Sequence, residues 1–153
     1  MSELAERWGT DLQLLRNLDI QKDRDRGRDL ATQKQDDTNQ VDLKTLHGLD
    51  NLKQALLLRF LTPKGELSPL GHPNYGSRLF ELIGEPNIET NRNLAKLYTL
   101  EALQSEPRVQ EIISVDVQPV NKSEVRIHAS LKAVESNTVL NLVFPFFLDS
   151  QVA

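Results

Sequence analysis

Apolar residues in the middle of the chain recur at helical spacing. They fall at steps of three and four, which places them on one stripe of an amphipathic helix that Thr62 and Pro63 should end. The residues of this stripe are Leu46, Leu49, Leu52, Leu56, Leu57, Phe60 and Leu61. We expect the stripe to be core, because its burial is what holds a domain of this size together.

A loop and a short helix should follow. Residues 64–76, KGELSPLGHPNYG, hold three glycines and two prolines, a density of breakers that excludes a regular helix or strand. We expect a structured loop in which residues 69–75 pack onto the helices through their apolar members. Ser77 suits the N-cap of a short helix that Gly84 would end in a left-handed turn. That helix would carry Leu79, Phe80, Leu82 and Ile83.

A second long helix is predicted from about Asn87 to Glu106. Its apolar residues cover a wide arc, so the helix should touch neighbours on more than one side. They are Leu94, Leu97, Tyr98, Leu100, Ala102 and Leu103. Pro107 disfavours the α conformation for Glu106, so the helix should stop there and the chain should leave in a new direction.

Beyond Arg108 the period of the pattern changes to two, which is typical of strands. In the first strand Ile113, Val115 and Val117 should face inward. The second strand should bury Val125, Ile127, Ala129, Leu131 and Ala133 and turn Glu124, Arg126, His128, Ser130 and Lys132 to water.

The last segment, TVLNLVFPFFL, is apolar on both faces. One face holds Leu140, Leu142, Phe144 and Phe146, and the other holds Val139, Val143 and Phe147. Only one side of a small meander is covered by its own helices, so the second face predicts contact with another chain. Burial of both faces by the N-terminal part of the chain is the alternative. Pro145 lacks an N–H and belongs on an edge strand, where a partner strand could pair.

The pattern as a whole predicts an α+β fold, with helices packed on one face of a small antiparallel β-meander and an extended N-terminal arm. The arm would span residues 1–41 and the folded domain residues 42–153. A run of mixed charge at residues 22–37 buries too little to order itself, which favours a solvated or mobile arm. An arm that orders on a partner, with Leu12 and Leu14 added as a strand, is the second interpretation.

Composition narrows the function classes. The chain has 153 residues, a formal net charge of -4 and no cysteine. An acidic balance argues against nucleic acid as a partner, because phosphate binding needs a concentrated excess of Lys and Arg. Cysteine is absent, which excludes disulfides and thiolate sites and suits a reducing cytoplasm. No secretory signal and no apolar run long enough for membrane insertion is evident, so we expect a protein that is soluble and cytoplasmic at synthesis.

No residue pattern predicts a cofactor or a metal. His47, His72 and His128 lie far apart, without a carboxylate at ligand spacing. Acids do gather near the end of the second helix, at Glu101, Glu106 and Glu111. Glycoside hydrolysis needs two such groups several ångströms apart. Nothing marks any of them as buried, so the sequence supports an enzyme only weakly.

The helix-to-strand turn at Glu106, Pro107 and Arg108, here named the Glu-Pro-Arg corner, places an acid and an arginine at a fixed point. Neither long charged side chain is needed to fill a core, so the corner could grip another molecule. A guanidinium can make bidentate, charge-assisted contacts to a partner. An internal pair of Glu106 and Arg108 that braces the turn is the alternative, and the residue chemistry alone favours it.

Several motifs, in one order, resemble a known family. The segments TPKGE, HPNYGS, IGEPN and SEPRVQEI are similar to those of the baseplate wedge and sheath-initiator proteins of contractile tails, related to gene product 25 of phage T4. The resemblance covers residues 43–113 closely and the following strands by pattern only. The Glu-Pro-Arg tripeptide is the hallmark of that family.

The resemblance implies a structural protein of a baseplate, with six copies around a central tube and spike. Glu106, Pro107 and Arg108 would dock on the larger baseplate wedge proteins, and tube or spike hub proteins are further candidate partners. Strands would template the first sheath ring, with sheath protein bound at Val139, Leu140, Leu142, Phe144 and Phe146. A peptidoglycan-hydrolysing, lysozyme-like protein and a free-standing adaptor that binds through its N-terminal arm are the alternatives.

Overall fold

The computed structural model describes residues 8–15 and 30–149. The chain divides into two compact units, residues 1–55 and 56–153. This division falls inside helix α2 (Gly48–Leu61). The predicted boundary between an arm and a domain after residue 41 is a different division and stays a prediction.

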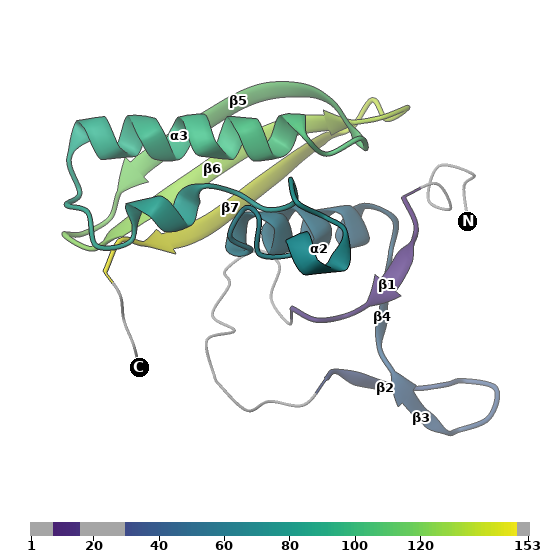
Figure 1. Ribbon diagram of the computed structural model, residues 1–153. Coiled ribbons are helices and arrows are strands. Elements are labelled where there is room, and N and C mark those ends of the chain that lie inside the picture. Colours follow the sequence, from purple (N-terminus) through teal and green to yellow (C-terminus); the bar gives the residue numbers. More distant parts are fainter. Residues whose placement is uncertain (1–7, 16–29, 150–153) are drawn as a thin grey trace. The chain divides into compact units, whose positions relative to one another are not determined.

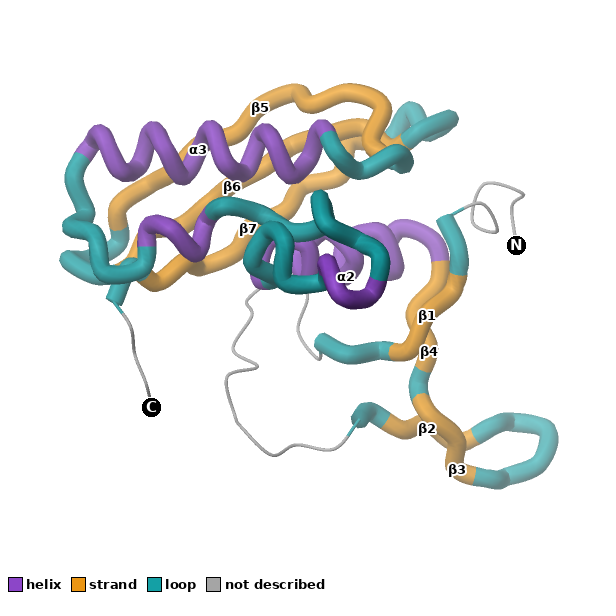
Figure 2. The backbone as a smooth tube through the Cα atoms, in the orientation of Figure 1, coloured by secondary structure: helices purple, strands orange, loops and turns teal. Residues whose placement is uncertain are grey.

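Among the described residues of the first unit, the strands form two short antiparallel pairs (Figure 2). Strand β1 (Thr10–Leu12) pairs antiparallel with β4 (Thr45–His47), and β2 (Thr32–Lys34) pairs with β3 (Val41–Leu43). Leu46 therefore lies in a strand, and the prediction that helical structure begins there is wrong. Gly48, the first residue of α2, has a φ of 59° and directly follows the strand.

The chain after β1 is anchored by the buried side chain of Gln54. The Gln54 carbonyl oxygen accepts hydrogen bonds from the backbone N–H groups of Leu14 and Leu15, and its amide donates to the carbonyl of Leu12. The backbone at Leu12 and Leu14 is thus hydrogen-bonded to this chain's own α2, and Leu12 is in a strand paired within the chain. Residues 22–29 of the charge run lie outside the described residues.

The second unit is built on an antiparallel meander (Figure 1). Its strands are β5 (Val109–Pro119), β6 (Glu124–Ala133) and β7 (Val139–Phe147), with β6 in the middle. Helix α3 (Glu89–Gln104) lies along the sheet and packs mainly over β5. The ring of Phe60, at the end of α2, stacks on Phe144 with centroids 4.8 Å apart. The predicted α+β fold, with helices on a small meander, is confirmed.

The predicted alternation holds in β6. All five residues expected to face inward are buried, whereas their neighbours are exposed or half-buried. Of the residues expected to face water, Arg126 is exposed, whereas Glu124, His128, Ser130 and Lys132 are half-buried, because a central strand has neighbours on both sides. The polar face of β6 is therefore only partly open to water.

Strand β5 departs from simple alternation. Ile113 was expected to face inward, but it is 47% exposed, while Val115 is buried. The register with β6 shifts between Ile112 and Ser114, and again between Val109 and Glu111. An extra residue in one strand reverses the facing of what precedes it, so the period-two pattern fails at the irregularity.

The loop that follows α2 is held by its own backbone rather than by packing. Leu70 is 73% exposed and residues 69–74 are exposed throughout, so the prediction that this segment packs onto the helices is wrong except for half-buried Tyr75. Gly71 donates to the carbonyl of Ser68, and His72 donates to that of Leu67. A 3-10 turn, η1 (Ser68–Leu70), results. Leu61, at the end of α2, is also exposed.

The short helix predicted after Ser77 is the 3-10 helix η2 (Leu79–Leu82). Leu79 and Leu82 are buried, but Phe80 and Ile83 are exposed, in contrast to the expected apolar face. Three residues per turn place only one side of so short a segment against the core. Gly84 has a φ of 94°, as predicted for a left-handed turn.

Candidate functional site

Glu106 lies between the end of α3 and the start of β5. Ser105 caps the helix, the N–H of Glu106 bonds to the carbonyl of Leu103, and the N–H of Val109 bonds to the carbonyl of Glu106. The helix thus ends at Gln104, close to the predicted stop at Glu106. The Glu106 side chain is 4% exposed, so the expectation that neither charged side chain of the corner enters the interior is wrong for Glu106. A buried carboxylate needs partners, because leaving it unpaired is costly.

The first partner of Glu106 is Arg108. Its Nε donates to Glu106 Oε1 at 2.7 Å, and its backbone N–H donates to the same oxygen at 3.3 Å. The internal pair that residue chemistry favoured is therefore present. The Arg108 side chain remains 30% exposed at the surface beside Pro107, which is itself exposed.

The second partner, Arg59, comes from the last turn of α2. Its Nη2 donates to Glu106 Oε2 at 3.0 Å, and its Nη1 donates to the hydroxyl of Ser105 at 3.3 Å. The guanidinium lies over the ring of Tyr75, 4.5 Å from the centroid. Arg59 Nε is buried and has no hydrogen-bond partner among the residues that the structure describes. A cation buried to this degree depends on Glu106 and on the aromatic face.

Two opposing effects set the ionisation of Glu106. Burial alone would raise its pKa, but the hydrogen bonds and charge of Arg108, with the hydrogen bond from Arg59, hold the pKa below its ordinary value. Glu106 is therefore ionised at neutral pH. It acts as a fixed acceptor that joins α2, the end of α3 and the start of β5.

Sequence reasoning missed Arg59 and Tyr75. The available signal was an arginine inside the leucine stripe of α2, directly before Phe60, where a charged residue is out of place unless it is paired. The acid that pairs with it is 47 residues away in the sequence. A tyrosine two residues before Ser77, in the HPNYGS segment, supplies the aromatic face.

The loop that carries Tyr75 is pinned to the end of α2. Pro63 and Ser77 form a parallel bridge, in which Ser77 donates to the carbonyl of Thr62 and Lys64 donates to that of Ser77. The Ser77 hydroxyl donates to the carbonyl of Phe60 at 2.7 Å. It also lies 3.4 Å from the N–H of Leu79, but it does not occupy the N-cap of η2, which is Arg78.

A second charged cluster lies next to this loop. Arg78 bonds to Glu81 through Nε and Nη2 at 3.2 and 3.0 Å, and its guanidinium lies 4.5 Å from the centre of the Tyr98 ring. The hydrogen bond from Arg78 lowers the pKa of Glu81. Burial, followed by the hydrogen bond to Glu81, raises the pKa of Tyr98. One Arg-Tyr pair thus includes the tyrosine of the HPNYGS segment, and the other includes the arginine directly after that segment.

The residues predicted to bind sheath protein do not share one environment. Leu140, Leu142 and Phe144 are buried in the chain's own core, Phe146 is half-buried, and Val139 is 43% exposed. Strand β7 pairs only with β6 among the described strands, so it forms one edge of the sheet. What this strand can offer to another chain is its backbone edge and the outer face at Val139, not the buried side chains.

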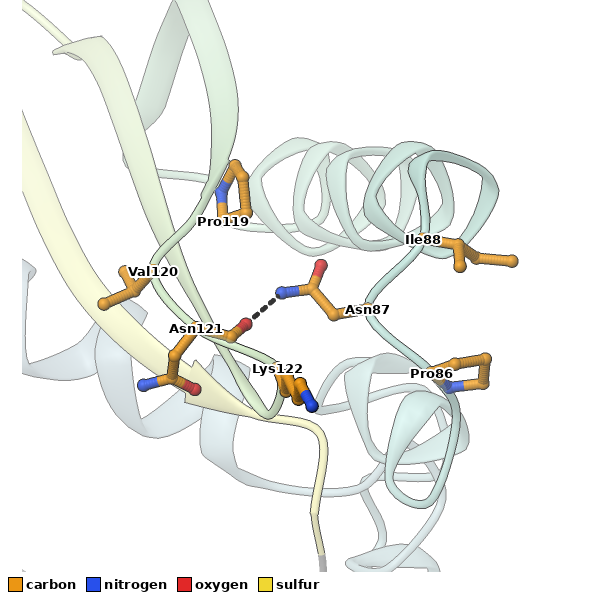
Figure 3. Close-up of a pocket in the computed structure, with 7 residues that line it drawn as sticks. All are labelled: Pro86, Asn87, Ile88, Pro119, Val120, Asn121 and Lys122. Carbon is orange, nitrogen blue, oxygen red and sulfur yellow. Dashed lines mark hydrogen bonds between the residues drawn. The ribbon is translucent and has the colours of Figure 1, made fainter.

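A separate open groove lies at the other end of α3 (Figure 3). Its volume is about 690 Å³, and its lining is Pro86, Asn87, Ile88, Pro119, Val120, Asn121 and Lys122. The Asn87 amide donates to the carbonyl of Asn121 at 2.7 Å, across the space between the IGEPN segment and the β5–β6 turn. No carboxylate lines the groove.

Neither a metal site nor a membrane span is found within the described ranges 8–15 and 30–149. No group of three or more His, Cys, Asp or Glu side chains could hold an ion there. None of the helices in this part of the chain is long and apolar enough to cross a bilayer.

Comparison with known proteins supplies the family context. The model for contractile injection system sheath initiators matches residues 24–136. A solved structure from Geobacter sulfurreducens, described as a candidate tail lysozyme, is similar with a TM-score of 0.58 and 24% identity. That match covers 67% of this chain and 93% of the other. At this identity the similarity to the solved structure shows the fold alone. The search of curated proteins found no match.

Proposed function

Because the chain belongs to the contractile injection system sheath initiators, we propose that it docks on larger baseplate wedge proteins through the Glu-Pro-Arg corner and offers strand β7 to the first ring of sheath protein. The family gives it a structural role in a baseplate, in association with baseplate and sheath components. Six copies per baseplate, synthesis in the cytoplasm and contact with tube or spike hub proteins belong to the proposal.

The observation that supports docking is that the two charged side chains of the corner differ in exposure. Glu106 is buried and committed to Arg59 and Arg108, so it is not the group that reaches a partner. Arg108 is held by Glu106 through Nε and is partly exposed. An arginine whose direction is fixed loses less side-chain entropy when it binds, which favours a specific contact.

Docking is tested by changing Arg108 and following assembly of the particle. Arg108→Ala should fold, because Arg59 still pairs with Glu106, but should be missing from purified baseplates. Arg108→Lys should also bind poorly, because lysine keeps the charge and loses the planar fork. Arg126→Ala, an exposed arginine on β6, is the matched control. Normal incorporation of Arg108→Ala would remove the central residue from the proposal.

Edge geometry supports strand addition at β7. The meander has two edge strands among the described residues, β5 and β7. The register of β5 with β6 is interrupted twice, whereas the nine residue pairs of β6 and β7 follow without a shift. Irregular edges resist added strands and regular ones accept them. Main-chain hydrogen bonds to β7 would carry the affinity.

A lysine on the outer face of β7 tests this second contact. Lysine on an edge strand discourages pairing with another chain. Val139→Lys should leave docking intact and reduce sheath polymerisation on isolated baseplates, scored by electron microscopy. Gln118→Lys, on the exposed part of the other edge strand β5, is the control. Equal sheath assembly by the two variants would contradict a role for β7.

A hydrolytic function is opposed by the chemistry of Glu106. The acid of a glycosidase must carry a proton and so needs a raised pKa, whereas arginine lowers the pKa of Glu106. Both of its oxygens are also occupied by Arg59 and Arg108. Purified protein should release no sugar from peptidoglycan across acid and neutral pH. Turnover that disappears in Glu101→Gln would support the enzyme instead.

A further inference from the structure

Strands β3 and β4 run on from each other as one strand, here named the β3–β4 strand (residues 41–47). Lys44 lies between them. Its backbone N–H donates to the carbonyl of Ala31, and its carbonyl accepts from the N–H of Gln13. These two hydrogen bonds come from the segments that carry β2 and β1 (Figure 2). Because the N–H and C=O of one strand residue point to the same edge, β1 and β2 follow each other along one edge of the β3–β4 strand.

The opposite edge of the β3–β4 strand is open. Neighbouring residues of an antiparallel strand hydrogen-bond alternately to one side and to the other. The N–H and C=O groups of Val41, Leu43 and Thr45 therefore point away from β1 and β2. Among the described residues, no strand pairs with them. The Leu43 N–H donates instead to Oδ1 of Asp42 at 2.7 Å.

This edge can accept a further strand. It holds no proline, and its register with β1 and β2 runs without a bulge, whereas protected edges often carry one or the other. The side chains of Val41 and Leu43 are 64% and 39% exposed. The outer edge of β1, by contrast, is covered within the chain, since Gln54 binds the backbone of Leu12 and Leu14.

Two charges of opposite sign decide which strand fits the edge. Asp42 and Lys44 are two residues apart, so they lie on the same face of the strand. A complementary antiparallel strand would present a lysine to Asp42 and an acid to Lys44. The β3–β4 strand itself, run in reverse, has that order. We propose that it pairs antiparallel with the same strand of a second copy of this chain, about a twofold axis at Leu43.

The pairing satisfies the open backbone groups. Leu43 would bond to Leu43 of the second copy, and Val41 would bond to the second copy's Thr45. Asp42 and the second copy's Lys44 then face each other at a position without backbone hydrogen bonds, where side chains come closest. The Leu43 N–H passes from Asp42 to a carbonyl of the second copy, which frees a carboxylate oxygen for that lysine.

The charges also select this register. Since the open groups belong to odd-numbered residues, the two strands keep odd residues opposite odd ones. An axis at Asp42 would set aspartate against aspartate, and an axis at Lys44 would set lysine against lysine. Like charges directly opposite each other are destabilising. The segment VDLKT is therefore self-complementary in the arrangement centred on Leu43.

Pairing would join two small ribbons into one four-stranded sheet. A two-stranded ribbon is marginally stable by itself and gains from further strands. Pairing would also cover an edge that otherwise attracts unrelated strands. The inference concerns the free protein and goes beyond the proposed function, because neither Arg108 nor strand β7 takes part in it.

Self-association of the full-length protein gives the first test. Sedimentation velocity from about 1 μM to about 1 mM should show the mean mass rising toward twice that of the monomer, because an interface of this size is weak. Hydrogen exchange of the Val41, Leu43 and Thr45 amides should slow as the concentration rises. A protein that stays monomeric throughout, or exchange at these amides that ignores concentration, would overturn the inference.

Charge variants test the register. Asp42→Lys and Lys44→Asp should each weaken self-association at least about tenfold, because each sets like charges opposite each other twice. An equal mixture of the two variants should associate at least as tightly as the wild type, since every opposed pair is then of opposite sign. Lys122→Asp, on the exposed β5–β6 turn, is the matched control and should behave as the wild type.

The mixture separates pairing from a structural effect. A substitution that only damaged the fold would not be rescued by a second damaged chain. If the mixture associated no better than either variant alone, the proposed register would be wrong. If both variants self-associated as the wild type does, the second copy would bind elsewhere and the proposal would fail.

Discussion

Glu106 Oε2 accepts a hydrogen bond from Arg59 Nη2 at 3.0 Å, although 47 residues separate the two in the sequence. The same carboxylate binds Arg108 through its other oxygen. Glu106 of the Glu-Pro-Arg corner therefore stabilises the fold from inside, whereas Arg108 lies partly exposed at the surface. The corner is rigid because three elements converge on one buried charge.

Replacing Glu106 by glutamine should destabilise the fold. Breaking a buried ion pair by removing one partner costs about 3–5 kcal/mol, and Glu106→Gln leaves buried Arg59 without its carboxylate. We expect the free energy of unfolding to fall by about 3 kcal/mol, the lower end, because the amide oxygen still accepts one hydrogen bond. Urea denaturation measures it. Glu111→Gln, 62% exposed, is the control, and equal losses in both variants would contradict the framework role.

The contribution of Glu106 should also depend on pH. Its pKa in the folded protein is lower than its ordinary value of 4.5, so its stabilising effect is present above that value and is lost as the pH falls through the lower folded pKa. The difference in unfolding free energy between wild type and Glu106→Gln should be constant from about pH 7 to about pH 5.5 and shrink below about pH 4.5. A difference that grows on acidification would mean that the folded pKa is raised.

Glycine at position 76 should be irreplaceable, unlike glycine at position 71. Both have a positive φ, but a Cβ at 76 would lie 2.4 Å from the carbonyl oxygen of Thr62, whereas a Cβ at 71 meets nothing within 4 Å. Gly71→Ala should cost about 1–2 kcal/mol from backbone strain alone. Gly76→Ala should cost more, because the bridge between Pro63 and Ser77 must open. Thermal unfolding of the two variants compares them, and equal losses would show that the close approach is unimportant.

The features that could be predicted from the sequence are those set by residues close together in the chain. Helix α3, its stop before Pro107 and the alternation in β6 are local patterns, and each was predicted correctly. The facing of Ile113 was not, because a register shift depends on the partner strand as much as on the strand itself. Leu70 was expected to pack but is exposed, because backbone hydrogen bonds hold its loop without apolar packing.

Only part of the candidate site could be predicted from the sequence, for the same reason. Pro107 marks the corner from sequence alone, and the internal pairing of Glu106 with Arg108 was the one of two alternatives that residue chemistry favoured. Arg59 and Tyr75 join them through tertiary structure, and no short-range pattern links a residue of α2 to a loop tyrosine and a distant acid. A charged residue within an apolar stripe was the one usable sign.

Strand β7 should separate into an inner side that holds the fold and an outer side that does not. Phe144 is buried and stacks on Phe60, so Phe144→Ala should lower the free energy of unfolding by about 4 kcal/mol through lost burial and a cavity. Val139 is 43% exposed, and Val139→Ala should change it by less than about 0.5 kcal/mol. Chemical denaturation of both variants makes the comparison. If Val139→Ala were as damaging as Phe144→Ala, the outer face would be part of the core, and no surface on β7 would be left for a neighbouring strand.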